Sequence, residues 1–207
     1  GLAFIFGIII AIPVGVISAY KHYSWFDNGG TFFTMLGYSV PTFLTGLLAI
    51  IIFSVWLGWF PSFYRTTHTV VWTDWTTIWF QIKQMIMPVM VLSLFNAAAL
   101  TRFTRSAMLD NLNEDYVRTA RAKGLSERQV VVGHAMRNSM IPVVTLIALQ
   151  VPGIFAGAII TEQIFRINGL GALLITAIGQ ADVPMVQTLS FIFAVLIVIF
   201  NLFADLM

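Results

Sequence analysis

The residues of this chain that could do chemistry are mainly basic, and they gather in one segment. Seven of the eleven Lys and Arg residues lie between Arg102 and Arg137. Three of them, Arg118, Arg121 and Lys123, could pair with acidic groups on another protein through charge-assisted hydrogen bonds. The chemistry that this segment offers is recognition of a partner.

The remaining polar residues do not match a catalytic, phosphate-binding or metal-binding motif. The chain has no cysteine, its histidines at positions 22, 68 and 134 stand far apart, and the phosphate-binding pattern G-x-x-x-x-G-K-[ST] does not occur. Gly169 and Gly171 are too few for a phosphate cradle, so a tight turn is expected there. We therefore expect no catalytic residue, no metal ligand and no cofactor in this chain, and a membrane enzyme is disfavoured.

The composition is that of a membrane protein. The 207 residues are 58% hydrophobic and 10% charged, whereas soluble domains have about 45–50% apolar and about 25% charged residues. The formal net charge of +2 is too small to indicate nucleic acid as a partner. Contact with membrane lipid follows directly from the composition.

Five apolar runs are long enough to cross a membrane, which takes about 20 residues each. They predict an all-α, polytopic single domain over 1–207, with a charged loop at 104–137. The chain begins inside an apolar run, so we expect a further span to precede it in the complete protein. The five predicted spans are 2–20, 31–56, 85–103, 139–160 and 185–203.

The connecting segments predict an orientation. Lys21 and the seven basic residues of 102–137 would lie on the cytoplasmic side, and Arg65, Lys83 and Arg166 on the other side, which agrees with the positive-inside rule. Segment 24–30 is expected to be a short polar link. Segment 58–83 holds four of the six tryptophans and is expected at the membrane surface, where a short interfacial helix could lie.

Cap and stop signals predict two helices in the charged loop. Asn113 is expected to cap a helix that Gly124 ends, because glycine is the usual residue at a left-handed helix terminus. Leu125 follows as an apolar latch. Ser126 and Gln129 have the spacing of a capping box that opens a second helix.

Uncharged polar residues within the spans are candidates for a pathway or for helix contacts. For Asn96 and Gln150, pathway lining and hydrogen bonding between helices are both open, whereas hydrogen bonding between helices is favoured for Thr145 and Ser190. No charged residue is expected in mid-span, so the sequence does not predict a proton relay. A self-powered secondary transporter is therefore disfavoured.

Two segments resemble those of a known family. Arg118, Thr119, Ala120 and Gly124 stand where permease subunits of ABC importers commonly carry Glu-Ala-Ala and a following Gly. The variant RTARAKGL followed by HAMRN is similar to the peptide/nickel branch, and within it to the B-type permease of dipeptide and oligopeptide systems. A second stretch carries that branch's Glu-x-Ile-Phe, Gly-Leu-Gly and Asp-x-Pro elements, with Asn168 and Gln180 departing from the commoner residues. This periplasmic-side motif includes Glu162, Phe165, Gly169, Gly171 and Asp182.

The resemblance implies a type I ABC importer permease in a bacterial-type cytoplasmic (inner) membrane. Its partners would be a homologous second permease, two ATP-binding subunits that hold ATP and Mg, and an extracytoplasmic substrate-binding protein. The substrate would be a di- or oligopeptide, with nickel or glutathione as alternatives. The coupling helix that docks the ATP-binding subunit would use Tyr116, Arg118, Thr119, Ala120, Arg121, Lys123, Gly124 and Leu125.

Two of these residues have alternative roles. Arg121 could contact a lipid headgroup instead of a protein. Glu162 could cap a helix or form a salt bridge with Arg166, which is the favoured interpretation, or it could contact the binding protein.

Overall fold

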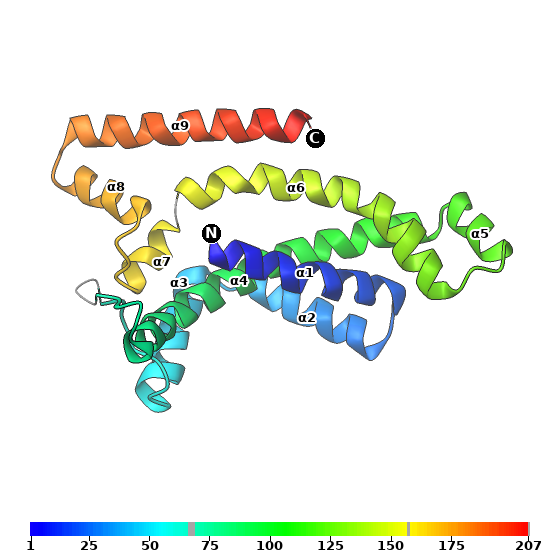
Figure 1. The fold of residues 1–207 in the computed structure, drawn as a ribbon, viewed down its shortest axis with the longest axis horizontal. Coiled ribbons are helices and arrows are strands. Elements are labelled where there is room, and N and C mark those ends of the chain that lie inside the picture. The colour runs from blue at the N-terminus through cyan, green and yellow to red at the C-terminus, as the bar shows by residue number, and fades with distance from the viewer. Residues whose placement is uncertain (66–68, 157, 207) are drawn as a thin grey trace.

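The computed structural model describes residues 1–65, 69–156 and 158–206, and within these ranges the regular elements are all helical. The predicted all-α class is confirmed. The elements are α1 (Leu2–Tyr20), α2 (Trp25–Ser39), α3 (Thr42–Ala49), η1 (Ile50–Trp56), α4 (Trp75–Leu112), α5 (Asp115–Ala122), η2 (Gln129–Ala135), α6 (Met136–Ala156), α7 (Ile159–Ile164), α8 (Leu170–Gly179) and α9 (Val183–Leu206), where η1 and η2 are π-helical (Figure 1).

Among the described residues, four helices are long and apolar enough to cross a membrane. They cover Leu2–Tyr20, Trp75–Leu112, Gln129–Ile154 and Val183–Phe203. The pair Trp25–Ser39 and Thr42–Trp56 makes a fifth if this bent pair is counted as one span. About five spans were expected, and the first and last have nearly the predicted bounds.

Helices α1 and α4 run side by side at the centre of the molecule (Figure 1). Small residues allow their backbones to approach closely, as is common between membrane helices. A Cβ atom on Gly7 would lie 2.9 Å from Cβ of Asn96, and one on Gly15 would lie 2.8 Å from Cβ of Thr104. Residues larger than glycine at these two positions would push the helices apart.

The predicted span over 31–56 is broken into two helices, because the chain bends by 102° between Trp25–Ser39 and Thr42–Trp56. Val40 precedes Pro41 and is extended, with φ −85° and ψ 124°, since the proline ring disfavours helical geometry in the residue before it. The predicted polar link 24–30 is wrong. Helix α2 begins at Trp25, and the side chain of Ser24 accepts a hydrogen bond from the backbone N–H of Asp27.

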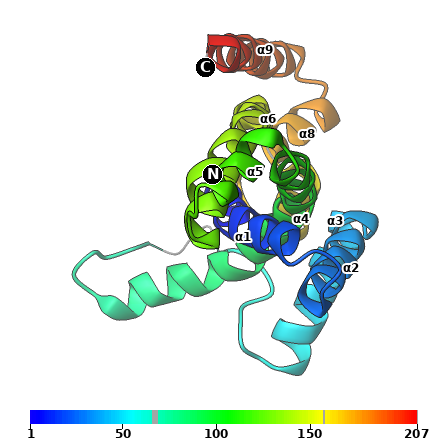
Figure 2. The same ribbon diagram turned by 90° about the vertical axis from the view of Figure 1, so that its right-hand side faces the viewer.

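Helix α4 is longer at both ends than the predicted span 85–103. It has 38 residues and is therefore about 57 Å long, well beyond the roughly 30 Å of a bilayer core. Asp74 caps it by accepting a hydrogen bond from the backbone N–H of Thr76 at 2.9 Å. The first turns, which the sequence placed within a surface segment, extend sideways from the rest of the molecule in Figure 2.

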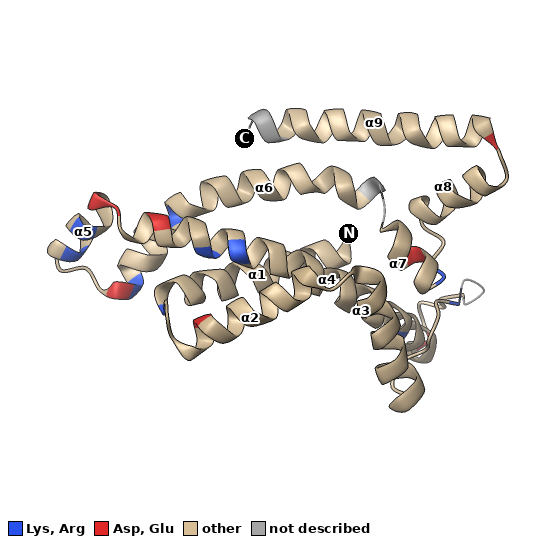
Figure 3. Ribbon diagram, turned by 180° about the vertical axis from the view of Figure 1, so that it is seen from behind, with Lys and Arg blue, Asp and Glu red and all other residues tan. Residues whose placement is uncertain are grey.

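The fourth span also differs from its predicted bounds of 139–160. Continuous helix runs from Gln129 to Ala156 through η2 and α6, and a separate short helix, α7, follows. Helix α9 packs against α6 and α8 and exposes most of its surface. Figure 3 shows charged residues gathered around α5 at one end of the molecule, with others near α7 at the opposite end; these ends are called the α5 end and the α7 end below.

Candidate functional site

Helix α5 is held rigidly against the body of the protein. Its buried residues Val117 and Ala120 join a cluster with Ala19 of α1 and Met108 of α4, completed by Val130, Val131 and Ala135 of η2. Burial of apolar side chains stabilises the folded state by about 25 cal/mol for each Å² of surface removed from water. This cluster therefore fastens α5 to three other elements. A force on α5 therefore reaches α1, α4 and α6.

The turn after α5 has the predicted geometry. Gly124 has φ +78°, a left-handed conformation that glycine adopts without steric cost. Ser126 and Gln129 form the predicted capping box, with Ser126 Oγ donating to Gln129 Oε1 at 2.8 Å and Gln129 N–H donating to Ser126 Oγ at 3.4 Å. Arg121 Nε donates to Glu127 Oε1 at 2.8 Å and so bridges the turn.

The predicted N-cap at Asn113 is wrong. Asn113 ends α4, and its side chain donates to the backbone carbonyl of Leu109. Glu114 occupies the cap position of α5 without a side-chain hydrogen bond to that helix. The side-chain amide of Asn113 donates to a backbone carbonyl in the last turn of α4, where carbonyls lack a helical partner. This bond uses the side chain at the C-terminus of α4, so it does not cap the N-terminus of α5.

The predicted docking residues divide between two faces of α5. Ala120 is buried, and the Tyr116 hydroxyl donates to Asn111 Oδ1 at 2.7 Å, so these two side chains face the body and position the helix. The residues on the outer side are Arg118, Thr119, Arg121, Lys123, Gly124 and Leu125, all exposed. Arg118 has 71% of its side chain exposed and lies 3.6 Å from Asp115, a pair too exposed to hold the guanidinium in place.

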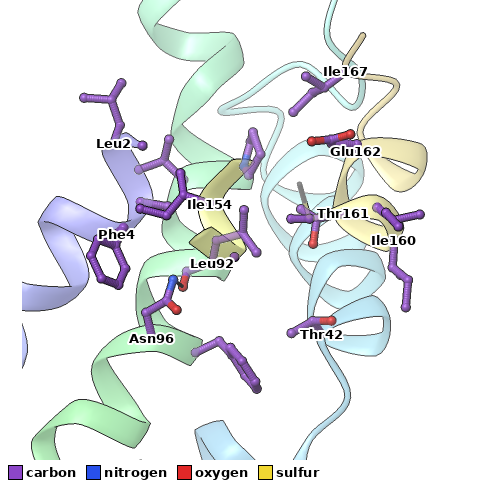
Figure 4. Close-up of a pocket in the computed structure, with 18 of the residues that line it drawn as sticks. Leu2, Phe4, Thr42, Leu92, Asn96, Ile154, Ile160, Thr161, Glu162 and Ile167 are labelled. Carbon is purple, nitrogen blue, oxygen red and sulfur yellow. Dashed lines mark hydrogen bonds between the residues drawn. The ribbon is translucent and has the colours of Figure 1, made fainter. Parts of the chain in front are cut away.

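A cavity of about 1080 Å³ opens among α1, α4, α6 and α7. Most of its wall is apolar, and Asn96 and Gln150 both line it, together with Tyr64, Gln81 and Glu162. Figure 4 shows Asn96 on α4 across the cavity from Thr42 and Thr161. The two predicted pathway residues are therefore brought together on one hollow surface.

The polar groups of the cavity are largely uncharged and are oriented by neighbours. Asn96 Nδ2 donates to the carbonyl of Leu92 at 2.8 Å, and Gln81 Nε2 donates to the Tyr64 hydroxyl at 2.6 Å. The Asn96 carbonyl oxygen has no partner among the described residues and remains available to accept a hydrogen bond. Thr145 does not bond between helices as predicted, because its hydroxyl donates to Ile141 of its own helix, and Ser190 is exposed on α9.

The periplasmic-side motif forms a compact turn between α7 and α8. Glu162 Oε2 accepts a hydrogen bond from the backbone N–H of Ala172 at 2.9 Å, so the favoured capping interpretation is confirmed. A Cβ atom on Gly169 would lie 2.2 Å from Glu162 Cδ, and one on Gly171 would lie 2.6 Å from Ile159. Gly171 is thus required by close approach to the backbone of Ile159, and a side chain at Gly169 would displace the Glu162 carboxylate, in agreement with the predicted tight turn.

The other members of this motif have structural contacts as well. Phe165 is 2% exposed and packs with Ala49, Met87 and Val91. Asp182 accepts a hydrogen bond from the backbone N–H of Met185 at the start of α9. The Arg166 guanidinium lies 4.5 Å from the Phe63 ring centroid, and no salt bridge between Arg166 and Glu162 occurs in the described part of the chain.

Sequence reasoning missed one buried ion pair. Asp27 of α2 is 2% exposed and accepts hydrogen bonds from Arg105 Nε at 2.6 Å and Arg105 Nη2 at 2.7 Å. Its carboxylate also accepts from the Ser18 hydroxyl at 2.6 Å and from the backbone N–H of Tyr23 at 2.9 Å. A lone carboxylate close to an apolar run was the signal that could have found it, because such a group requires a partner when buried.

No metal centre is evident within residues 1–65, 69–156 and 158–206, where no three His, Cys, Asp or Glu side chains gather. His68, one of the three histidines considered from the sequence, lies outside the described residues.

Comparisons with known proteins place this chain in a family. Residues 11–207 match the model of the family described as binding-protein-dependent transport system inner membrane component. The oligopeptide transport system permease protein AppB of Bacillus subtilis (strain 168) is 43% identical over 204 residues, which cover 98% of this chain and 63% of that protein. The dipeptide transport system permease protein DppB of Escherichia coli (strain K12) is 41% identical over 222 residues, covering 99% of this chain and 66% of that protein. The chain thus spans somewhat less than two thirds of the length of these relatives.

Proposed function

This chain belongs to the family of binding-protein-dependent transport system inner membrane components, and we propose that it forms the translocation pathway of an ATP-driven peptide importer. The observation that carries this proposal is the two-sided character of α5. Its inner face is locked into the helical body through Val117 and Ala120, while its outer face presents Arg118 and Lys123. Such a helix is suited to receive a push from another protein and to pass it into the membrane helices.

The partner that pushes would be an ATP-binding subunit with acidic groups near its docking cleft. Lys123 can pair with those groups, and so can Arg118, whose exposed pair with Asp115 at 3.6 Å holds it only weakly; Arg121 is engaged by Glu127 at 2.8 Å. Arg121 therefore stiffens the turn, and a role for it as a lipid-headgroup contact is less favoured. ATP and Mg would be bound by that partner, since this sequence has no phosphate-binding pattern.

The cavity suits a peptide as the transported molecule. Asn96, Gln150, Gln81 and Tyr64 offer uncharged donors and acceptors on a mainly apolar wall, which matches the amides and varied side chains of a di- or oligopeptide. The relatives named above are described as oligopeptide and dipeptide permeases. Nickel and glutathione remain the alternative substrates of this branch.

Transport would proceed by alternating access. Movement of α5 on ATP binding would rock the helices that surround the cavity, opening it to one side of the membrane and then to the other. A homologous second permease would complete the pathway, a second ATP-binding subunit would dock on that permease, and a substrate-binding protein would deliver peptide at the α7 end. The assembly would reside in the cytoplasmic (inner) membrane of a bacterium.

The test is purification of the intact, tagged membrane complex followed by uptake measurements in liposomes. The proposal expects co-purified ATP-binding subunits and a second permease, and ATP-dependent uptake of a labelled dipeptide. Excess unlabelled dipeptide with an ordinary α-peptide bond should compete, whereas nickel and the γ-linked glutathione should not. Uptake by this chain alone without ATP would contradict the proposal.

A further inference from the structure

Helix α2 has unusually little packing to hold it in place. Of its fifteen residues, all of them described, Asp27 is the one that is buried. A groove of about 460 Å³ separates part of α2 from α1 and α4, lined by Phe26, Gly29 and Gly30 on α2 and by Ala97 and Ala98 on α4. Apolar contact along the middle of α2 therefore contributes little to its position.

Two contacts fasten α2 on either side of this groove. At the far end, Gly37 lies against Ala98, and the Tyr38 and Phe95 rings stack with centroids 6.1 Å apart. At the α5 end, the Asp27 carboxylate joins α2 to two other helices, through Ser18 of α1 and Arg105 of α4, and also bonds the backbone of Tyr23 in the turn before α2. A bidentate guanidinium–carboxylate pair fixes orientation as well as distance.

This ion pair adjoins the cluster that holds α5. Ser18, which bonds Asp27, immediately precedes Ala19, and Arg105 is three residues, or one helical turn, before Met108. Ala19 and Met108 both pack in the cluster with Val117 and Ala120. The path from α5 to α2 thus consists of one apolar cluster and one ion pair.

At its far end, α2 leads into the wall of the cavity. The chain bends at Val40 and Pro41, and the first residue of α3, Thr42, lines the cavity opposite Asn96 (Figure 4). A displacement of α2 would therefore reach the cavity through this bend.

We propose that Asp27 and Arg105 are positioning residues for energy coupling: their pairing makes α2 move as one body with α5, so that a push on α5 reaches the cavity wall at Thr42. This inference rests on the proposed function. In this proposal, the single Asp27–Arg105 ion pair makes the bent span, α2 with α3, move together with α5.

The first experiment compares transport with ATP hydrolysis in the complete complex. Asp27→Asn and Arg105→Gln should lower the number of peptides imported per ATP hydrolysed at least about tenfold, at unchanged abundance of the complex. Arg102→Gln is the matched control, since Arg102 lies one turn away on α4 and is exposed. An unchanged ratio in Asp27→Asn would overturn the proposal, as would an equal loss in the control.

A second measurement does not depend on transport or on the survival of these variants. Because the sequence has no cysteine, nitroxide labels can be placed on cysteines introduced at Trp25 of α2, which is 95% exposed, and at Asp115 of α5, whose side chain is also exposed. In the otherwise unsubstituted complex, the distance between the labels should stay narrow and constant when an ATP analogue is added. A change of several ångströms would refute the joint movement of α2 and α5.

The two measurements separate the possible failures. If the unsubstituted complex hydrolyses ATP but imports no peptide, the proposed function is wrong, while the label distances still decide whether α2 follows α5. If import is normal but the label distance in the unsubstituted complex changes when the ATP analogue is added, the positioning role is wrong and the proposed function stands.

Discussion

Asp27 and Arg105 are 78 residues apart in the chain and meet through two hydrogen bonds of 2.6 and 2.7 Å. Their contact ties the start of α2 to the part of α4 that leads directly into α5. Helix α4 continues for seven residues beyond Arg105, a rise of about 10 Å. The ion pair therefore stands close to the point where the docking helix leaves the membrane domain.

Removal of the Asp27 carboxylate should destabilise the protein. Asp27→Ala leaves the Arg105 guanidinium without its partner in a largely buried position, which costs about 3 kcal/mol in comparable cases. Denaturant unfolding in detergent would measure the loss. Asp110→Ala on the same α4, at an exposed position, should change stability by less than about 0.5 kcal/mol, and an equal effect of both substitutions would contradict this account.

Reversal of charge on the outer face of α5 should uncouple the complex without unfolding it. Arg118 is exposed, and its ion pair with Asp115 at 3.6 Å is weak. Arg118→Glu should therefore change the free energy of unfolding by less than about 1 kcal/mol. Peptide import should fall at least about tenfold, because the substituted residue would repel an acidic docking cleft. Arg128→Glu, exposed beyond the turn, serves as the control, and normal import by Arg118→Glu would remove Arg118 from the docking face.

The turn after α5 should tolerate only residues that accept a left-handed backbone. Gly124 has φ +78° with open space around it, so Gly124→Ala should cost about 1 kcal/mol through backbone strain alone. Gly124→Asn should cost less, since asparagine visits this conformation more readily. Thermal unfolding of both variants would test the ranking, which would be wrong if Ala were the better tolerated.

A side chain at position 169 should displace the Glu162 carboxylate from the start of α8. A Cβ atom there would lie 2.2 Å from Glu162 Cδ, so Gly169→Ala must displace the carboxylate that caps α8 and should cost about 1–3 kcal/mol. Gly179→Ala in the same α8 is the matched control, because nothing lies within 4 Å of its Cβ position. Limited proteolysis at the α7–α8 turn would report the difference, and equal sensitivity of the two variants would argue against the close approach.

Loss of one amide from the cavity should weaken peptide binding modestly. Gln150 is half-buried and lines the cavity, so Gln150→Leu removes one hydrogen-bonding group and should raise the KM for import about 2- to 10-fold. Gln187→Leu, at an exposed position on α9, should leave KM unchanged. Equal KM values for both variants would place Gln150 outside the pathway.

Much of the fold could be predicted because its signals are local. The apolar runs gave the first and last spans, and Gly124 and the Ser126–Gln129 pair gave the turn geometry of the charged loop. These features depend on residues within a few positions of one another. Composition and spacing are therefore sufficient to find them.

The errors have two different causes. The 102° bend has a local cause in Pro41, but proline is also tolerated inside membrane helices, so the apolar run alone did not predict a break there. The other errors arose where distant residues decide the outcome. The segment around Asp27 looked like a polar link because its partner, Arg105, is far away in the sequence. The division of α5 into an inner face with Ala120 and an outer face with Arg118 likewise depends on α1, α4 and η2.

The most direct test of the central claim is photo-crosslinking from the outer face of α5 in native membranes. A photoreactive amino acid at Thr119, which is exposed on α5, should form an adduct with an ATP-binding subunit, and ATP should change its yield. The same amino acid at Trp25, exposed on α2 near the same end, should not form that adduct. If Thr119 crosslinks to no ATP-binding protein while the complex still imports peptide, α5 is not the element through which the transporter is driven.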